Sequence, residues 1–169
     1  RPYVYPMYHP FGFFVATMAV TATIVAINNQ QYYYNAGVYY VVVDGGYNAV
    51  PPPVNITVVE IPDNKEAIKV NDNTYYYYAG IFYVKIGDEY KVVEAPDGAI
   101  VSNIPEGGEE VEIADEKYVV LNNTYFKPVT LEGKEQYQVV EMVADDSSDT
   151  DNGDTGAEST ETAPEDSSK

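Results

Sequence analysis

The residues of this chain that could act as acids, bases or nucleophiles are few. Cysteine is absent, and the single histidine, His9, lies in an opening segment of alternating prolines and tyrosines. A Ser–His–Asp arrangement needs a histidine that is held rigidly by a third group, and the residues around His9 do not suggest such support. We therefore expect no catalytic histidine, no thiolate metal site and no cofactor.

Carboxylates are plentiful, and two of them are enough for glycoside hydrolysis by acid–base catalysis. Those in the repeats, such as Glu94 and Glu106, lie at expected turns and sheet edges, where a solvated charge is the ordinary role. In the acidic C-terminal segment, placing Gly153 at position six of a calcium loop puts Ser159 at position twelve, where an EF-hand needs glutamate. We expect no enzymatic activity and no metal site, with a carboxylate-dependent glycoside hydrolase as a remote alternative and weak cation binding by the acidic segment left open.

Tyrosine is the best candidate for a binding surface, because the chain has 18 tyrosines and no tryptophan. Successive side chains of a strand point to opposite faces, so Tyr75 and Tyr77 should share one face and Tyr76 and Tyr78 the other. One row could fill the core while the other contacts a sugar ring or another protein. The alternative is that both rows are structural and one is covered by an adjacent repeat. The candidate binding residues are Tyr33, Tyr39, Tyr76 and Tyr83.

A sequence block that begins near Ile27 returns every 43 residues and must position these tyrosines. The third copy takes an insertion of four residues before Tyr137. A single unit of this size buries too little surface to fold alone, so neighbouring units should share a core. The predicted organisation is a Pro/Tyr arm with an apolar segment (1–26), repeat 1 (27–69), repeat 2 (70–112), a cap-like repeat 3 (113–143) and a disordered acidic tail (144–169).

Each copy reads as a four-stranded antiparallel meander with polar turns. Gly37, Gly80 and Asn123 share one repeat position and accept positive φ, which predicts a three-residue hairpin loop ending in a left-handed residue. Replacing Gly80 with valine should strain this loop. The proline-containing segments after each meander should be edge or connecting strands. The fold class is therefore all-β, with tandem antiparallel β-meander repeats in a row; a closed propeller would typically need about four to eight blades.

Charge and hydropathy narrow the set of partners. The net charge is −18, and both the repeats and the tail are acidic, which disfavours nucleic acid and anionic lipid. The charge-free run Phe11–Ile27 is slightly short for a membrane span of about 20 residues and is rich in Thr and Val. We expect it to form a buried strand or interface, while membrane association and a signal-like remnant are alternatives. The prolines of the opening segment favour a flexible or draped arm, and the tail lacks the apolar residues needed to fold.

Several blocks resemble a Tyr-rich repeat family of exported Gram-negative bacterial proteins, which is classified as a domain of unknown function. They are Tyr32–Tyr40, Tyr76–Tyr83, Val92–Pro96 and Ile104–Gly108, and the resemblance covers most of residues 11–143. It implies a periplasmic or outer-surface location and supplies no catalytic residues. The sequence leaves open whether an anchoring segment precedes Arg1.

These observations together predict a non-catalytic cell-envelope protein. It would be structural, or would bind an envelope component or another protein through Tyr-rich β surfaces. A glycan-binding module is the alternative.

Overall fold

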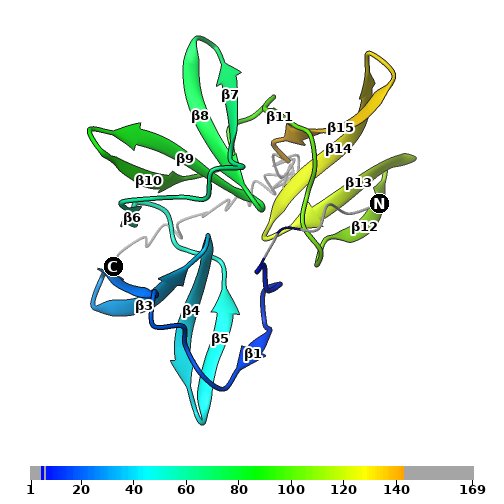
Figure 1. Ribbon diagram of the computed structural model, residues 1–169. Coiled ribbons are helices and arrows are strands. Elements are labelled where there is room, and N and C mark those ends of the chain that lie inside the picture. Colours follow the sequence, from blue (N-terminus) through cyan, green and yellow to red (C-terminus); the bar gives the residue numbers. More distant parts are fainter. Residues whose placement is uncertain (1–4, 6, 143–169) are drawn as a thin grey trace, which may run out of the picture.

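The computed structural model describes residues 5 and 7–142, which contain strands and no helix. In this part of the chain, 15 strands form three five-stranded antiparallel sheets of the same strand order (Figure 1). The all-β tandem-repeat prediction is confirmed. The first sheet contains β1 (Phe14–Val15), β2 (Thr23–Ile27), β3 (Gln30–Asn35), β4 (Val38–Val43) and β5 (Gly46–Val50).

The other two sheets repeat this set of strands. The second contains β6 (Thr57–Val58), β7 (Glu66–Val70), β8 (Asn73–Tyr78), β9 (Ile81–Ile86) and β10 (Glu89–Val93). The third contains β11 (Ile100–Val101), β12 (Glu109–Ile113), β13 (Glu116–Leu121), β14 (Thr124–Leu131) and β15 (Lys134–Val140). The 43-residue offset holds strand by strand, and the four inserted residues lengthen the hairpin between β14 and β15.

Each sheet has one strand more than the predicted meander. The extra strand has two residues and pairs with the last strand of the meander, as β1 does with β5, β6 with β10 and β11 with β15. These edge strands lie in what we call the lead-in segments, residues 11–22, 54–65 and 97–108. The sheets themselves span 14–50, 57–93 and 100–140, so each begins ahead of the boundaries drawn at 27, 70 and 113.

Backbone hydrogen bonds fix the three lead-in segments in the same way. The Gly12 amide donates to the Ala49 carbonyl at 2.7 Å, and the Ala49 amide donates to the Phe13 carbonyl at 2.8 Å. Val92 makes the equivalent pair with Asn55 and Ile56. The apolar run Phe11–Ile27 is therefore the first lead-in segment together with β2.

The prediction that this apolar run is buried was wrong for much of its length. Phe14 and Ile24 are 49% and 56% exposed, although both belong to strands. β1 and β2 are the two edges of the first sheet, and the residues between them form a loop, so several outer sides meet solvent. The part of the chain that the structure describes has no helix long and apolar enough to cross a membrane.

The two largest buried clusters lie between consecutive sheets. One buried cluster joins Tyr34 and Tyr39 of the first sheet to the second lead-in segment and the second sheet, through Ile56, Val58, Ile61, Ile81, Tyr83 and Val92. A second cluster repeats this contact one unit later, joining Tyr77 and Phe82 to Ala99, Val101, Ile104, Phe126 and Val139. The sheets therefore pack in sequence order, and Figure 1 shows that they fan around a common centre.

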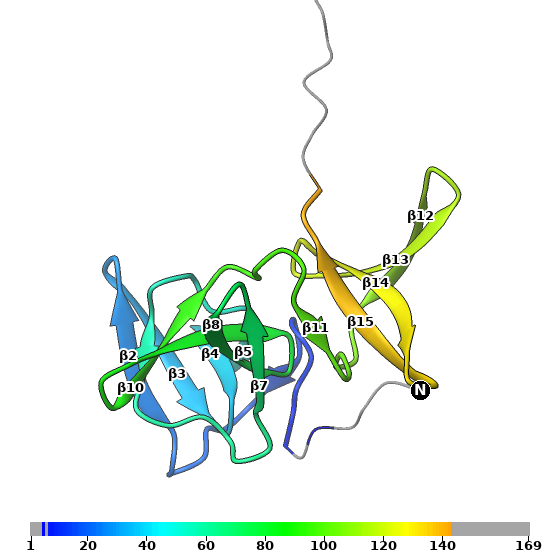
Figure 2. The ribbon, with the colours of Figure 1, turned by 90° about the horizontal axis from the view of Figure 1, so that it is seen from above.

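The opening arm, described at Tyr5 and Met7–Pro10, is draped over the sheets. In Figures 1 and 2 it lies between the first and third sheets. The Tyr5 ring lies 5.0 Å from the Tyr78 ring of the second sheet. His9 Nδ1 lies 2.6 Å from the hydroxyl of Tyr40 in the first sheet, and its ring stacks on Phe13 with centroids 4.5 Å apart. The acidic tail predicted at 144–169 lies outside the described residues.

The turn between the second and third meander strands has two residues, so the predicted three-residue loop was wrong. Tyr78 pairs with Ile81, which leaves only Ala79 and Gly80 in the loop. Both have positive φ, 46° and 87°, as a type I′ hairpin requires. The sequence indicated that a glycine would occupy this turn. It did not indicate the positive φ of Ala79, because the left-handed region is uncommon for alanine.

The same turns pack tightly against the next unit. A Cβ atom on Gly37 would lie 2.2 Å from Tyr78 Cε1, and one on Gly80 would lie 2.6 Å from Leu121 Cδ2. Each turn therefore leaves room for a side chain of the following sheet. Glycine is needed there both for its φ and for its missing side chain.

We expect Gly80→Val to destabilise the protein more than Gly45→Val. Gly45 has φ +81° with nothing within 4 Å of its Cβ position, so its variant has only the backbone cost, about 1–2 kcal/mol. Gly80→Val should lose about 1–3 kcal/mol more, because the new side chain overlaps Leu121. Urea unfolding of both variants measures the difference. Equal losses would show that the turn does not pack as described.

Candidate functional site

Two of the four candidate tyrosines are inaccessible. Tyr39 and Tyr83 are 1% and 0% exposed and lie between the first and second sheets. Their hydroxyl oxygens are 2.8 Å apart and share a hydrogen bond. Neither ring offers a face to a ligand, so these two tyrosines connect sheets.

The other two candidates, Tyr33 and Tyr76, are half-buried and lie on different sheets. Tyr33 meets Tyr47 edge to face, with ring centroids 5.1 Å apart. Tyr76 meets Tyr90 in the same way at 5.5 Å, and two lysines lie over the Tyr90 ring. These pairs do not present the flat row of rings on which sugars stack, and the structure does not gather the four candidates into one surface.

Tyrosine hydroxyls also connect each sheet to the next lead-in segment. Tyr34 donates a hydrogen bond to the Glu60 carbonyl at 2.7 Å, and Tyr77 donates to the Asn103 carbonyl at 2.8 Å. The two donor tyrosines are 43 residues apart in the sequence, and so are the two acceptor residues. Tyr77 and Tyr78 are both buried, so tyrosines on both faces of β8 are structural, as one of the two sequence interpretations proposed.

Burial changes the acidity of these tyrosines. Desolvation is the main cause that raises the pKa of Tyr39, Tyr77 and Tyr83 well above its ordinary value. Desolvation, with a smaller effect from Glu106, raises the pKa of Tyr8 to about 12. The folded state therefore keeps these phenols neutral at pH values where exposed tyrosines ionise.

The repeat creates two equivalent seams, each between the free edge of one sheet and the next lead-in segment. The first seam lies between β2 and residues 57–62, and the second lies between β7 and residues 100–105. The first seam holds an open groove of 650 Å³, whereas the cavity at the second seam measures 240 Å³. The sequence repeat predicted neither seam, because both depend on how consecutive sheets pack.

The second seam is bridged by polar side chains and narrowed by the arm. Glu66 Oε2 accepts hydrogen bonds from the Ser102 amide at 3.1 Å and from the Ser102 hydroxyl at 2.9 Å. Tyr5 lines the remaining cavity, and its hydroxyl donates a hydrogen bond to Asn103 Oδ1. Tyr5 is 5% exposed, so the arm is a built-in occupant of this seam.

Among the residues that the structure describes, the first seam has neither feature. Thr23 and Val59 occupy the positions of Glu66 and Ser102, and they cannot form the carboxylate–hydroxyl contact. Val59 is 72% exposed and Ile24, which also lines the groove, is 56% exposed. The result is a largely apolar groove whose lining also includes Glu60, Asp63 and Glu89.

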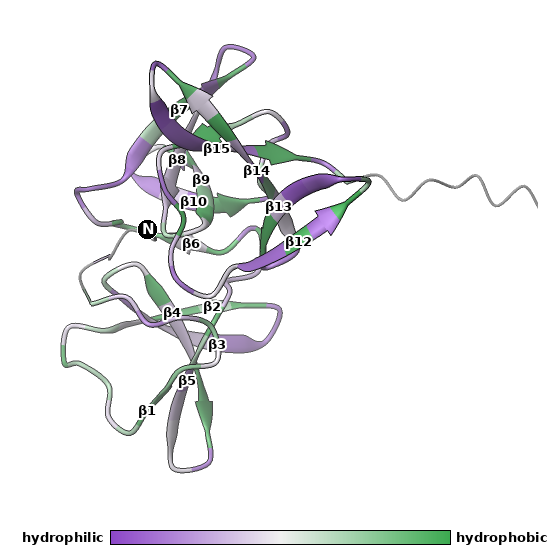
Figure 3. Ribbon diagram, turned by 90° about the vertical axis from the view of Figure 1, so that its right-hand side faces the viewer, coloured by the Kyte–Doolittle hydropathy of each residue, from purple (hydrophilic) through white to green (hydrophobic). Residues whose placement is uncertain are grey.

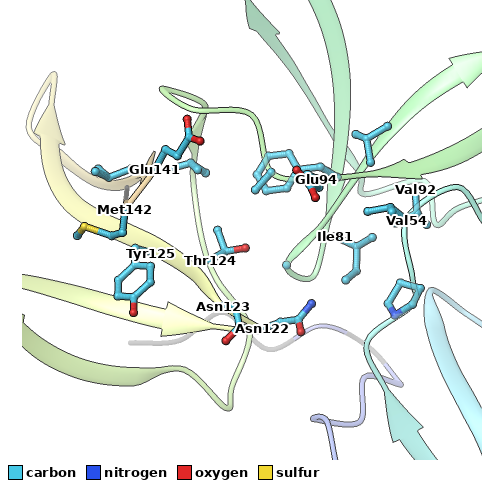
Figure 4. A pocket seen from close by; sticks show the side chains of 17 residues that line it. Val54, Ile81, Val92, Glu94, Asn122, Asn123, Thr124, Tyr125, Glu141 and Met142 are labelled. Atoms are coloured by element: carbon cyan, nitrogen blue, oxygen red, sulfur yellow. The ribbon is translucent and has the colours of Figure 1, made fainter. Parts of the chain in front are cut away.

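A separate pocket of 420 Å³ lies where the second and third sheets approach residues 52–54. Figure 4 shows Tyr125, Glu141 and Met142 entering it from the third sheet, with Ile81, Val92 and Val54 on the opposite side. Its other labelled residues are Glu94, Asn122, Asn123 and Thr124. The pocket therefore combines amide, hydroxyl and carboxylate groups with one aromatic ring.

The described residues do not contain three or more histidine, aspartate or glutamate side chains grouped as metal ligands. His9 contacts a tyrosine hydroxyl and a phenylalanine ring. These contacts hold the arm on the first sheet.

Comparison with known proteins places the chain in a family. Residues 1–143 match the model of DUF6515, a family of unknown function. The chain belongs to this family. The DUF6515 match covers all three sheets and ends where the acidic tail begins. No curated protein and no solved structure matches the chain. Membership of a family of unknown function is confirmed, whereas the Tyr-rich, Gram-negative character of that family, export and the envelope location stay predictions.

We expect the hydroxyls of Tyr39 and Tyr83 to be strongly coupled in stability. Replacing either one with phenylalanine leaves the other hydroxyl buried without its partner, at a cost of about 1–3 kcal/mol. Replacing both should be nearly neutral, because Phe82 and Phe126 stand at the equivalent positions of the next interface. Urea unfolding of the two single variants and the double variant measures the coupling. Additive losses would rule out the shared hydrogen bond.

We expect stability to fall as the pH rises above about 10, where tyrosines of the unfolded chain ionise. The buried tyrosines keep their protons in the folded state, so the unfolded chain binds fewer protons and gains stability relative to the native state. Each such tyrosine contributes a loss of up to about 1.4 kcal/mol per pH unit. Urea titrations between about pH 9 and 12, with tyrosinate absorbance as a second signal, test this. Stability that stays level over this range would contradict it.

Proposed function

We propose that this protein is a non-catalytic scaffold of the cell envelope that binds an extended segment of another protein in the open first seam. One observation carries the proposal: the groove of 650 Å³ lies at a position whose repeat equivalent is occupied by the chain's own arm. The fold can therefore accommodate a side chain from an additional segment at this position.

The walls of the groove support this proposal because they are held in place without a ligand. Val58 and Ile61 are 3% and 2% exposed and belong to the core between the first two sheets. Tyr34 fixes the Glu60 backbone through its hydroxyl. A rigid groove loses little entropy when a partner binds, whereas the exposed Ile24 and Val59 offer apolar surface for it.

The free edge of β2 adds a second means of recognition. β2 is the outermost strand of the first sheet, and an edge strand can pair its backbone with an extended peptide. The apolar groove beside it would then receive alternate side chains of that peptide. The envelope location of the proposal rests on the resemblance of the Tyr-rich blocks to exported bacterial proteins.

Glycan binding is the second candidate, and the pocket of Figure 4 favours it. The Asn122 and Asn123 amides, the Thr124 hydroxyl and the Tyr125 ring line this pocket together, and sugars are bound by such groups. Glu94 and Glu141 line it too, so the remote alternative of carboxylate-dependent glycoside hydrolysis would also be located there.

The test compares two exposed valines. Val59 in the groove is 72% exposed and Val42 in the first sheet, outside the groove, is 65% exposed. Neither change should unfold the protein. We expect an envelope-protein extract to yield a partner that the wild type and Val42→Glu retain and Val59→Glu loses.

The same preparation separates the alternatives. Saturable binding of surface polysaccharide or peptidoglycan that Asn123→Ala weakens and Val59→Glu does not would favour the glycan module. If the wild type, Val42→Glu and Val59→Glu all retain the same proteins, the groove is not the binding site.

A further inference from the structure

We infer that the first seam takes the tyrosine side chain of a positively charged segment, seated as Tyr5 is seated in the second seam. This inference rests on the proposed function of the groove and adds the chemistry of its occupant. The inference is based on a comparison of the residues that line the two seams at equivalent repeat positions.

The two cavities share the same framework. Five positions that line the groove of the first seam have their repeat equivalents in the lining of the second-seam cavity, each 43 residues later. In the first seam they are Thr21, Thr23, Tyr34, Val59 and Glu60, and in the second they are Asn64, Glu66, Tyr77, Ser102 and Asn103. The two remaining members of the second-seam lining are Lys65, whose repeat equivalent Ala22 does not line the groove, and Tyr5, which comes from the arm.

Tyr5 shows how an aromatic side chain fits this framework. Its ring packs on Tyr78 with centroids 5.0 Å apart and an interplanar angle of 73°, and Ala79 belongs to the same buried cluster. Its hydroxyl donates to the Asn103 side chain. The framework therefore supplies an apolar wall for the ring and an acceptor for the phenol.

In the first seam other residues supply these two functions. Asn35 stands in place of Tyr78 and its side chain accepts a hydrogen bond from Thr21 at 3.0 Å, so the apolar wall for a ring comes from Ile24 and Val59, which also line the groove. Glu60 replaces Asn103. A carboxylate accepts a phenol hydrogen bond more strongly than a neutral amide does, so the preference for a hydroxyl-bearing ring is retained.

The electrostatic field selects the charge of the segment. Glu60, Asp63 and Glu89 line the groove, and the chain has a net charge of −18. Like charges across an interface are unfavourable, so an acidic segment is disfavoured and a basic residue near the tyrosine is favoured. The same field disfavours a second copy of this chain, and a different protein is the expected source.

The opening arm supplies a probe of the required chemistry. Residues 1–10 contain Arg1, Tyr3, Tyr5 and Tyr8, three prolines and no acidic residue. A synthetic, fluorescently labelled peptide of this sequence can be titrated with the full chain and followed by fluorescence anisotropy. We expect saturable binding that weakens as salt is added and is lost when the three tyrosines of the peptide are replaced by alanine.

A variant that closes the groove shows where the peptide binds. Thr23→Glu combined with Val59→Ser installs the residue pair that ties the second seam together. We expect this double variant to lower the affinity at least tenfold while its thermal unfolding stays near that of the wild type. Val42→Glu, which adds a carboxylate outside the groove, should leave the affinity unchanged and is the matched control.

Three outcomes would overturn the inference. They are absence of peptide binding, equal binding by the wild type and the closing variant, and equal binding by the tyrosine-free peptide. If the peptide does not bind but Val59→Glu still abolishes capture of the partner, the proposed function of the groove is supported. Only the inferred preference for a tyrosine is then wrong. Self-association of the chain that the closing variant abolishes would overturn the assignment to a different protein.

Discussion

The structure depends on one constraint: its two largest buried clusters form only where consecutive sheets meet. Tyr34 and Tyr39 of the first sheet, for example, are covered by Ile56, Val58 and Ile61 of the second lead-in segment, and only a small cluster of Val38, Tyr40 and Ala49 is buried within the first sheet. Repeat proteins in general gain stability from such neighbouring interfaces. The third sheet has no following sheet within the described residues. Its outer face carries half-buried Val111 and Tyr118 beside a Lys127–Glu116 ion pair of 3.4 Å, and Figure 3 shows hydrophilic stretches on β12 and β13.

Tyrosine suits these interfaces because it combines a large apolar ring with a hydroxyl that can reach a backbone acceptor. Between sheets the ring fills the core, and the hydroxyl of Tyr34 or Tyr77 pairs with a carbonyl of the next lead-in segment. A buried carbonyl without a partner would cost free energy. The abundance of tyrosine is thus explained to a large extent by packing, which removes the main reason to see every tyrosine cluster as a ligand surface.

Function is then to be sought where the repeats differ. In the second seam, Glu66 and Ser102 form hydrogen bonds with each other and Tyr5 occupies part of the space. In the first seam, Thr23 and Val59 stand at the positions of Glu66 and Ser102, and a groove is left between the same elements. Substitutions at a few repeat positions, together with the arm, therefore separate an internal contact from a groove. A scaffold built from copies can gain a binding site in this way without changing its fold.

The sequence by itself determined the all-β class, the period of 43 residues and the course of the meander strands, because these follow from local alternation and turn residues. It also marked Gly37 and Gly80 as turn positions, although not that their turns have two residues. Only the tertiary structure decided where each sheet begins, since a period has no intrinsic starting point and the lead-in strand pairs with a strand about 30 residues later. It alone decided that Tyr39 and Tyr83 are buried and that one seam is open, because both depend on which face of one sheet meets the next.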